Sequence, residues 1–273
     1  MTAVSVATTT DLSRARSRFP QVLRSEWTKV WSVRSTMWTL LSLVVVTMGF
    51  SALFAWGQTS NLHRLSAQEL ATVDPTNTAM AGLAFGQLAI AVLGVMIISS
   101  EYSTGGIRTT LTAVPDRLRV LAAKWLVFGI LAWVVGTITA FGAFFVAMPF
   151  WAHYDRAVSL GDPGVLRAVL GGGLIALASG MLGFALGTLL RHTAGAITAA
   201  VALLFVIPPL TNLLPGSWGN AIAIRFTTNA SQNISAVVHQ PGQLTPWVGY
   251  AWMTLEWVVP VLLGAYLMRR RDA

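Results

Sequence analysis

Residues 37–57 read MWTLLSLVVVTMGFSALFAWG, and this stretch decides the fold. Lys, Arg, Asp and Glu are all absent between Thr36 and Leu62. A helix rises about 1.5 Å per residue, so the run is long enough to cross the roughly 30 Å hydrocarbon core of a bilayer. The stretch therefore predicts a membrane-spanning helix.

Five more runs of the same kind follow along the chain. The composition agrees with this pattern, because 55% of the residues are hydrophobic and 10% are charged, whereas roughly a quarter are charged in a soluble domain. Six runs without a polar face argue against the core of a large soluble protein. The expected fold is an all-α integral membrane domain over residues 37–268. The further spans are expected at about 79–99, 121–151, 170–190, 194–214 and 247–268.

The basic residues predict how these spans are oriented. Most of the 18 Lys and Arg residues lie before the first span, between the second and third, or after the sixth. The positive-inside rule then places both termini in the cytoplasm, with residues 1–19 as a disordered tail and residues 269–273 as a short one. Lys124, near the start of the third span, is expected to extend its ammonium group to the interface. The tryptophans expected near the two interfaces are Trp38, Trp56, Trp151, Trp218 and Trp247.

The motifs that the chain lacks narrow its function. The net charge is +8, but the basic residues sit at the ends of apolar runs, so we expect membrane lipids as partners and not nucleic acid. No GxxxxGK[ST] phosphate loop, HExxH pair or GxSxG turn occurs, cysteine is absent and the four histidines are scattered. We therefore expect no catalysis and no bound metal or cofactor. The energy is expected to come from a partner or from an ion gradient.

Residues 20–36, which read PQVLRSEWTKVWSVRST, predict an amphipathic helix before the first span. Leu23, Trp27, Val30 and Trp31 recur at helical spacing, and polar residues occupy the other side. Such a helix lies flat on the inner leaflet, with its tryptophans at the acyl boundary and its basic groups near anionic headgroups. A solvated tail that merely obeys the positive-inside rule is the alternative.

The connector between the second and third spans, residues 101–124, reads EYSTGGIRTTLTAVPDRLRVLAAK. Its first residues suit a turn, and residues 107–114 suit a short helix that Pro115 ends, because proline lacks the amide donor. Asp116 can cap the helix that follows. A chain that only reverses direction needs fewer residues, so this excursion suggests a docking surface for another protein.

These segments together resemble the membrane subunit of an ABC transporter of the type-2 permease family. The resemblance rests on RSEWTKVWSVRSTMW at 24–38, on the 101–124 connector and on the closing GAYLMRRRDA at 264–273, and it covers about Leu23 to Ala273. It implies a dimer with a second permease copy or a paralogue. It also implies an ATP-binding ABC subunit as the partner that binds ATP and magnesium.

The resemblance further implies that the connector forms a coupling helix on that ATP-binding partner. The helix at 20–36 would be a connecting element at the same interface. The interface residues expected in the connector are Glu101, Tyr102, Gly105, Ile107, Arg108, Leu111, Pro115 and Arg117, and those in the connecting helix are Glu26, Trp27, Lys29, Trp31 and Arg34.

The resemblance also implies that the outer connector between the fifth and sixth spans partly re-enters the membrane. Its apolar patches AIAI (221–224) and ISAVV (234–238) are too short to span. They fit two short outer helices half-sunk in protein or interface. An ordinary external loop is the alternative.

Three features inside the spans carry their own expectations. Glu256, near the middle of span six, is read either as a substrate or cation contact in the translocation path or as a carboxyl that ties helices together. Gly183 and Gly187 form a GxxxG match, which favours close packing within one subunit over a dimer seam. Pro208 and Pro209 should interrupt the helix of span five.

The function expected from these observations is the permease subunit of an ATP-driven exporter in the bacterial cell (inner) membrane. A separate ATP-binding subunit would supply the energy. The alternatives are an autonomous secondary transporter or channel that uses Glu256, and a membrane anchor that transports nothing.

Overall fold

The computed structural model describes residues 19–106, 112, 116–238 and 242–270, and within these ranges the chain forms helices and no strand. Six helical stretches are long and apolar enough to cross a membrane, which confirms the all-α fold and the six spans. They are α3 (Arg34–Ser60), α5 with α6 (Pro75–Met80 and Leu83–Ser103), α8 (Arg117–Ala152), α9 (Val165–Leu190), α10 to α11 (Thr193–Thr211) and α14 (Pro246–Arg270).

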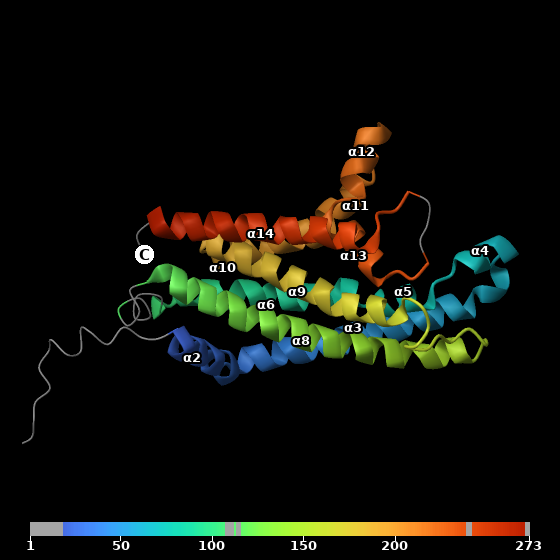
Figure 1. The fold of residues 1–273 in the computed structure, drawn as a ribbon, viewed down its shortest axis with the longest axis horizontal. Helices are drawn as coiled ribbons and strands as arrows, with labels where there is room; N and C mark the ends of the chain where they lie inside the picture. The colour runs from blue at the N-terminus through green and yellow to red at the C-terminus, as the bar shows by residue number, and fades with distance from the viewer. Residues whose placement is uncertain (1–18, 107–111, 113–115, 239–241, 271–273) are drawn as a thin grey trace, which may run out of the picture.

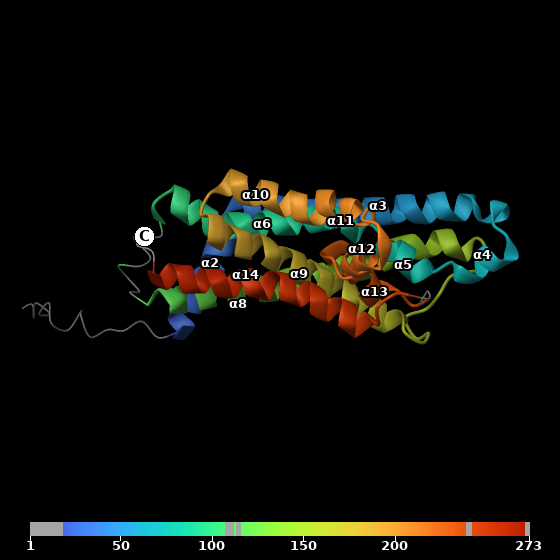
Figure 2. The ribbon, with the colours of Figure 1, turned by 90° about the horizontal axis from the view of Figure 1, so that it is seen from above.

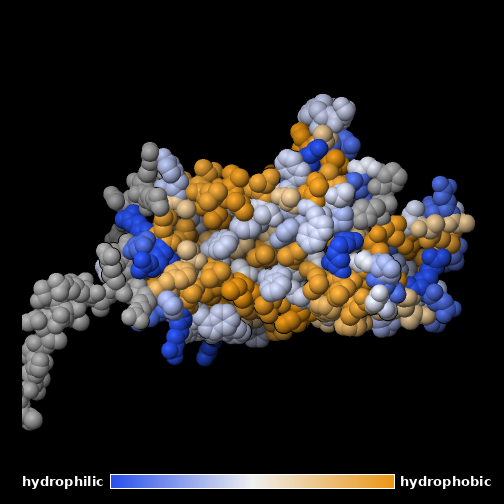
Figure 3. All heavy atoms as spheres, viewed as in Figure 1, coloured by the Kyte–Doolittle hydropathy of each residue, from blue (hydrophilic) through white to orange (hydrophobic). Residues whose placement is uncertain are grey.

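The six stretches run side by side along the longest axis of the molecule (Figure 1). The first described helix and the end of α14 lie at one end of this bundle, together with the start of α8 and the turn between α9 and α10. We call it the basic end, because Lys29, Arg117, Lys124 and Arg191 lie on these segments. In Figure 3, hydrophobic atoms cover the middle of the bundle and hydrophilic ones gather toward its two ends, as expected for a chain that crosses a bilayer.

The centre of the bundle is α9, which packs against α6, α8 and α14. Of its most apolar stretch, 83% is buried, against 22% for α14. Small residues allow this, because a Cβ on Gly183 would lie 2.0 Å from the carbonyl oxygen of Ala91, and one on Gly94 would lie 2.2 Å from that of Gly180. The predicted close packing of the Gly183–Gly187 stripe within one subunit is therefore confirmed.

The N-terminal helix α2 (Phe19–Ser32) runs across the long axis of the bundle rather than along it (Figure 2). It ends where Val33 adopts an extended conformation with φ −95° and ψ 113°. The amphipathic helix is therefore present, but the expected range of 20–36 is too long. Arg34 belongs to the first spanning helix, α3.

Four short helices lie at the opposite end of the bundle. Between the fifth and sixth spans the chain forms α12 (Gly216–Ala223), which projects away from the bundle, and α13 (Thr227–Ser235), which packs between α9 and α14 (Figure 1). The two predicted short helices are thus present, but ISAVV straddles the end of α13, and Ala236 is extended just beyond it. The remaining two, η1 (Leu62–Arg64) and α4 (Ala67–Thr72), follow α3.

Span five is interrupted where its prolines predict. It consists of α10 (Thr193–Val201), a π-helical turn η2 (Ala202–Val206) and α11 (Ile207–Thr211). Pro208 lacks the amide that would donate to the carbonyl of Leu204 four residues earlier. The hydroxyl of Thr228, on α13, donates to that carbonyl oxygen at 2.9 Å. A side chain from another helix thus satisfies the acceptor that proline leaves free.

Four of the five tryptophans expected near interfaces are exposed at helix ends or connectors, as an aromatic belt requires. Trp151 is the exception, because its side chain is 0% exposed. It lies at the last turn of α8, as expected, but packs with Ala147 and Val165 inside the protein. The expectation that Trp151 faces the membrane interface is therefore wrong.

Candidate functional site

A cluster of four charged side chains lies at the basic end, where three helices meet. Glu26 and Lys29 come from α2, Glu101 from the last turn of α6 and Lys124 from the second turn of α8. The Lys124 ammonium lies 2.6 Å from a Glu26 carboxylate oxygen and 2.5 Å from one of Glu101. Lys29 reaches the same two carboxylates at 2.8 Å and 3.0 Å. We call these four residues the charge cluster.

The cluster is electrically balanced and largely removed from solvent. The side chains of Lys124 and Glu26 are 2% and 4% exposed, whereas that of Lys29 is 42% exposed. Burial alone would lower the pKa of Lys29, but the carboxylates of Glu26 and Glu101 raise it above its usual range, so the ammonium stays charged at physiological pH. The two carboxylates and two ammonium groups thus stabilise one another, whereas burying any one of these charges alone at this site would be unfavourable.

The cluster corrects two expectations, one about Lys124 and one about the inward face of α2. Lys124 does not extend to the interface, because its side chain is buried against Glu26 and Glu101. The inward face of α2 is formed by Val22, Glu26 and Val30, which pack toward α8. Sequence periodicity missed this stripe because the carboxylate of Glu26 interrupts it. The signal that could have found it is Lys124, a lone lysine in an otherwise apolar span.

The tryptophans of α2 face away from that stripe. Trp27 and Trp31 are 44% and 48% exposed, and their ring centroids lie 5.7 Å apart. The helix therefore has one face against the protein and a second, aromatic face left uncovered. Arg34 is exposed at the start of α3. Of the five expected connecting-helix residues, the structure brings Glu26 and Lys29 into the charge cluster and leaves the other three outside it.

The two ends of the connector are described. α6 ends at Ser103, and Gly105 turns the chain with φ +73°, a value that glycine adopts without strain. Asp116 accepts a hydrogen bond from the backbone N–H of Arg119 at 3.2 Å and so caps α8, as predicted, directly before Arg117. The predicted short helix, with Ile107, Arg108, Leu111 and Pro115, lies outside the described residues.

The turn between α9 and α10 packs on the same end of α6. The guanidinium of Arg191 lies 5.0 Å from the ring centre of Tyr102, within cation–π range. The hydroxyl of Thr193 donates to that of Ser99 at 3.0 Å. The segment that leads into the connector is thus held by α2, by α8 and by the turn that follows α9.

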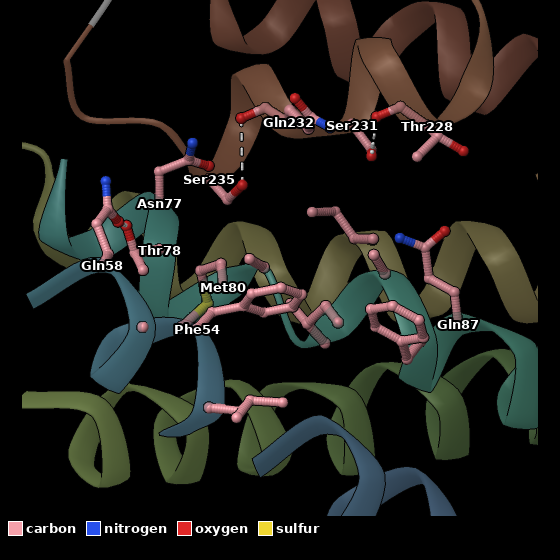
Figure 4. A pocket seen from close by; sticks show the side chains of 17 residues that line it. Phe54, Gln58, Asn77, Thr78, Met80, Gln87, Thr228, Ser231, Gln232 and Ser235 are labelled. Carbon is pink, nitrogen blue, oxygen red and sulfur yellow. Dashed lines mark hydrogen bonds between the residues drawn. The ribbon is translucent and has the colours of Figure 1, made fainter. Parts of the chain in front are cut away.

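A cavity of about 600 Å³ lies toward the opposite end, between α3, α5, α6 and α13 (Figure 4), and Ile175 of α9 also lines it. Its polar side chains include Gln58, Asn77, Gln87 and Ser231. Sequence reasoning did not find this site, because its walls come from four helices and no charged or histidine residue marks it.

A pair of charged residues fixes the helix that forms one wall of the cavity. The Asp74 carboxylate accepts hydrogen bonds from the backbone N–H groups of Val237 at 2.6 Å and Val238 at 2.9 Å, just beyond α13. The Arg167 guanidinium donates to the carbonyl oxygens of Ile234 at 3.0 Å and Ala236 at 2.7 Å. The donors and acceptors left at the end of this short helix are thereby satisfied.

Replacing Asp74 with alanine is expected to loosen α13. Its carboxylate also caps α5 through the N–H of Asn77, so the change leaves three backbone donors without their partner. The expected loss is about 1 to 3 kcal/mol. Hydrogen exchange at residues 237–238 should accelerate and the thermal midpoint in detergent should fall. Asp162→Ala, which removes an exposed turn acceptor, is the control, and equal effects of the two changes would contradict the assignment.

Glu256, the charged residue expected in the translocation path, lies half-buried on α14 between the buried Met253 and Trp257. It is not among the residues that line the 600 Å³ cavity. Its role in transport stays a prediction. Within the described ranges no group of three or more His, Asp or Glu residues could hold a metal ion.

The six helices that are long and apolar enough to cross a membrane indicate a multi-pass helical membrane protein. Neither the models of known protein families nor the curated proteins that were compared include a match to this chain.

Proposed function

We propose that this chain is the permease subunit of an ATP-driven exporter of the ABC type-2 kind, in the bacterial cell membrane. It would work as a dimer with separate subunits that bind ATP and magnesium. Both termini would face the cytoplasm, α2 would lie in the plane of the inner leaflet, and α12 and α13 would re-enter at the outer leaflet.

The observation that carries this proposal is the charge cluster. Glu101 is the first residue of the connector and Lys124 is the last. The two pair with each other, and each also pairs with a residue of α2, Glu101 with Lys29 and Lys124 with Glu26. A partner that pushes on the connector would therefore displace α6, α8 and α2 together. Such a rigid linkage converts a local docking event into a helix movement, which a connector that only reverses the chain would not need.

The exposed aromatic face of α2 supports the same topology. Trp27 and Trp31 are exposed side by side on a helix that crosses the bundle. Amphipathic rings in such a position suit the lipid interface. Basic residues concentrate at this end, so the positive-inside rule orients it toward the cytoplasm. The coupling residues that the partner would contact are Ile107, Arg108 and Leu111.

Co-purification in mild detergent followed by reconstitution tests the proposal. Nucleotide hydrolysis by a bound partner and solute export that requires it are the expected results. Solute flux through vesicles that contain this chain alone, and its loss in Glu256→Gln, would instead assign a secondary transporter. A bound partner without any transport would assign a membrane anchor.

Replacing Arg108 or Leu111 with alanine is expected to lower partner-stimulated transport about tenfold, the usual effect of losing a central interface contact. Insertion and thermal stability should not change, because the substitutions affect docking and not the bundle. Arg64→Ala, on the opposite end, is the matched control. Stimulated transport at the normal rate in both connector variants would refute docking at this segment.

A further inference from the structure

The cavity at the opposite end has the dimensions of a ligand site. Its volume of about 600 Å³ falls within the roughly 300 to 1,000 Å³ of small-molecule pockets. One wall is apolar and includes Leu53 and Phe54 of α3 and Phe85 of α6. The facing wall is α13, whose Thr228, Ser231, Gln232 and Ser235 line the cavity (Figure 4).

The lining offers hydrogen bonds but no charge. None of the 17 residues around the cavity is Asp, Glu, Lys, Arg or His. Amide groups, which both donate and accept, come from Gln58, Asn77 and Gln87, and hydroxyl groups come from Thr78 and the residues of α13. An ion that lost its water here would find no counter-charge, so the lining discriminates against charged molecules.

Among the polar groups of this lining, the Gln87 amide is one that the described part of the protein does not pair with a group of its own. Its residue is 4% exposed, yet among the hydrogen bonds of the described residues none involves its side-chain amide. In Figure 4 the amide points from α6 across the cavity toward α13. The amide atoms of Gln87 are not among the buried side-chain atoms that lack a partner, so they are open to the cavity and are not sealed inside the protein. The group is therefore placed to bind something that enters the cavity.

Phe54 and Phe85 provide the other half of a site. They lie at the rim, 37% and 38% exposed, with ring centroids 6.1 Å apart. Phe50 stacks on Phe85 at 4.0 Å, which fixes the orientation of that ring. A flat or branched apolar body can pack on these rings while its polar groups reach the amides opposite.

We propose that this cavity binds an uncharged amphiphile whose hydroxyl or amide groups hydrogen-bond Gln87 and the α13 wall and whose apolar part packs on Phe54 and Phe85. The identification of this ligand as the exported substrate rests on the proposed function. The binding itself does not, because every contact belongs to one chain.

The absence of cysteine from the chain permits a direct test with single-cysteine variants. Gln87→Cys reports from the deep end of the cavity, and Gln232→Cys reports from its exposed rim. Ser179→Cys, at a residue that is 0% exposed and outside the cavity, is the buried control. Each variant is placed in lipid nanodiscs without nucleotide, and its thermal midpoint verifies the fold.

The neutral reagent N-ethylmaleimide should modify Gln87→Cys and Gln232→Cys but not Ser179→Cys. The anionic reagent 2-sulfonatoethyl methanethiosulfonate should modify only Gln232→Cys. Chloramphenicol or ouabain, two uncharged amphiphiles that carry hydroxyl groups, should slow the modification of Gln87→Cys in a saturable manner. Chloramphenicol succinate, which carries a carboxylate, should not.

A second measurement uses the chain with no cysteine introduced and compares it with the Gln87→Leu variant. Binding of the protecting amphiphile should weaken roughly 5- to 10-fold in Gln87→Leu, which keeps the bulk and loses the hydrogen bonds. Equal modification of Gln87→Cys by both reagents, no modification by either, or no protection by either neutral amphiphile would overturn the proposal. Unchanged binding to Gln87→Leu would overturn the role of Gln87.

The two proposals fail separately in these experiments. Protection in nanodiscs without any ATP-driven export would leave the site standing and refute the proposed function. Export that depends on the partner, with no protection at Gln87→Cys, would refute the site alone.

Discussion

Replacing Lys124 with methionine is expected to lower the free energy of unfolding by about 3 kcal/mol or more. Methionine fills the same volume, but Glu26 and Glu101 would then share a buried site with Lys29 as their remaining ammonium group in the charge cluster. Removing one member of a buried ion pair costs about 3 to 5 kcal/mol, because the charge left behind is neither solvated nor balanced. The apparent thermal midpoint in detergent should fall by roughly 5 to 10 °C at a fixed scan rate.

Two matched variants show whether charge balance is the cause. Lys29→Met removes the same charge from the half-exposed position of the cluster, where an ion pair contributes about 1 kcal/mol or less, so the midpoint should move little. Combining Lys124→Met with Glu26→Gln and Glu101→Gln removes all three charges and should recover much of the loss. A triple variant as unstable as Lys124→Met would indicate that packing, and not electrostatics, controls the site.

The spans were predictable because each depends on local composition. A run of apolar residues such as 37–57 has one low-energy solution in a bilayer, a helix whose backbone satisfies its own hydrogen bonds. For the same reason α9 ends at Leu190, as predicted, and α14 begins at Pro246, one residue before the predicted start, although α9 begins at Val165, before the predicted 170. Caps and breaks such as Asp116 and Pro208 were also readable, because they act through neighbouring backbone groups.

The charge cluster was not predictable in the same way. Lys124, Glu101 and Glu26 are far apart in sequence, and each has a reasonable explanation when considered alone. A lysine near the end of a spanning helix usually extends to water, and a glutamate in an interfacial helix usually faces water too. Only the crossing of α2 over the start of α8 makes burial the better solution for both.

The cavity was missed for a related reason. The sequence of α13, TTNASQNIS, is mostly polar, and the prediction of a short helix there depended on the apolar patch ISAVV at its end. In the structure Ser231, Asn233 and Ser235 are buried, because Asp74 and Arg167 hold the end of this helix and Thr228 pairs with the interrupted helix of span five. Each of these contacts links residues from distant segments, so local pattern carries no trace of them.

Alanine at Gly183 is expected to have the other large effect, a loss of about 2 to 3 kcal/mol. The new methyl group would lie 2.0 Å from the carbonyl oxygen of Ala91, which is backbone and cannot rotate away. The whole of α6 would have to move, and overpacking of this kind costs about 1 to 3 kcal/mol or more. Because α9 is the centre of the bundle, the shift would also disturb its contacts with α8 and α14.

Gly49→Ala is the matched control for this change. It also replaces a glycine inside a spanning helix, but nothing lies within 4 Å of the position its Cβ would occupy. Alanine there should be neutral or should stabilise the protein by about 0.5 to 1 kcal/mol, since the unfolded chain loses freedom. Measured side by side, the thermal midpoint should fall for Gly183→Ala and stay the same or rise for Gly49→Ala. If both variants melt at the same temperature, the contact between α6 and α9 is looser than the structure shows, and close backbone packing is not what places α9 at the centre.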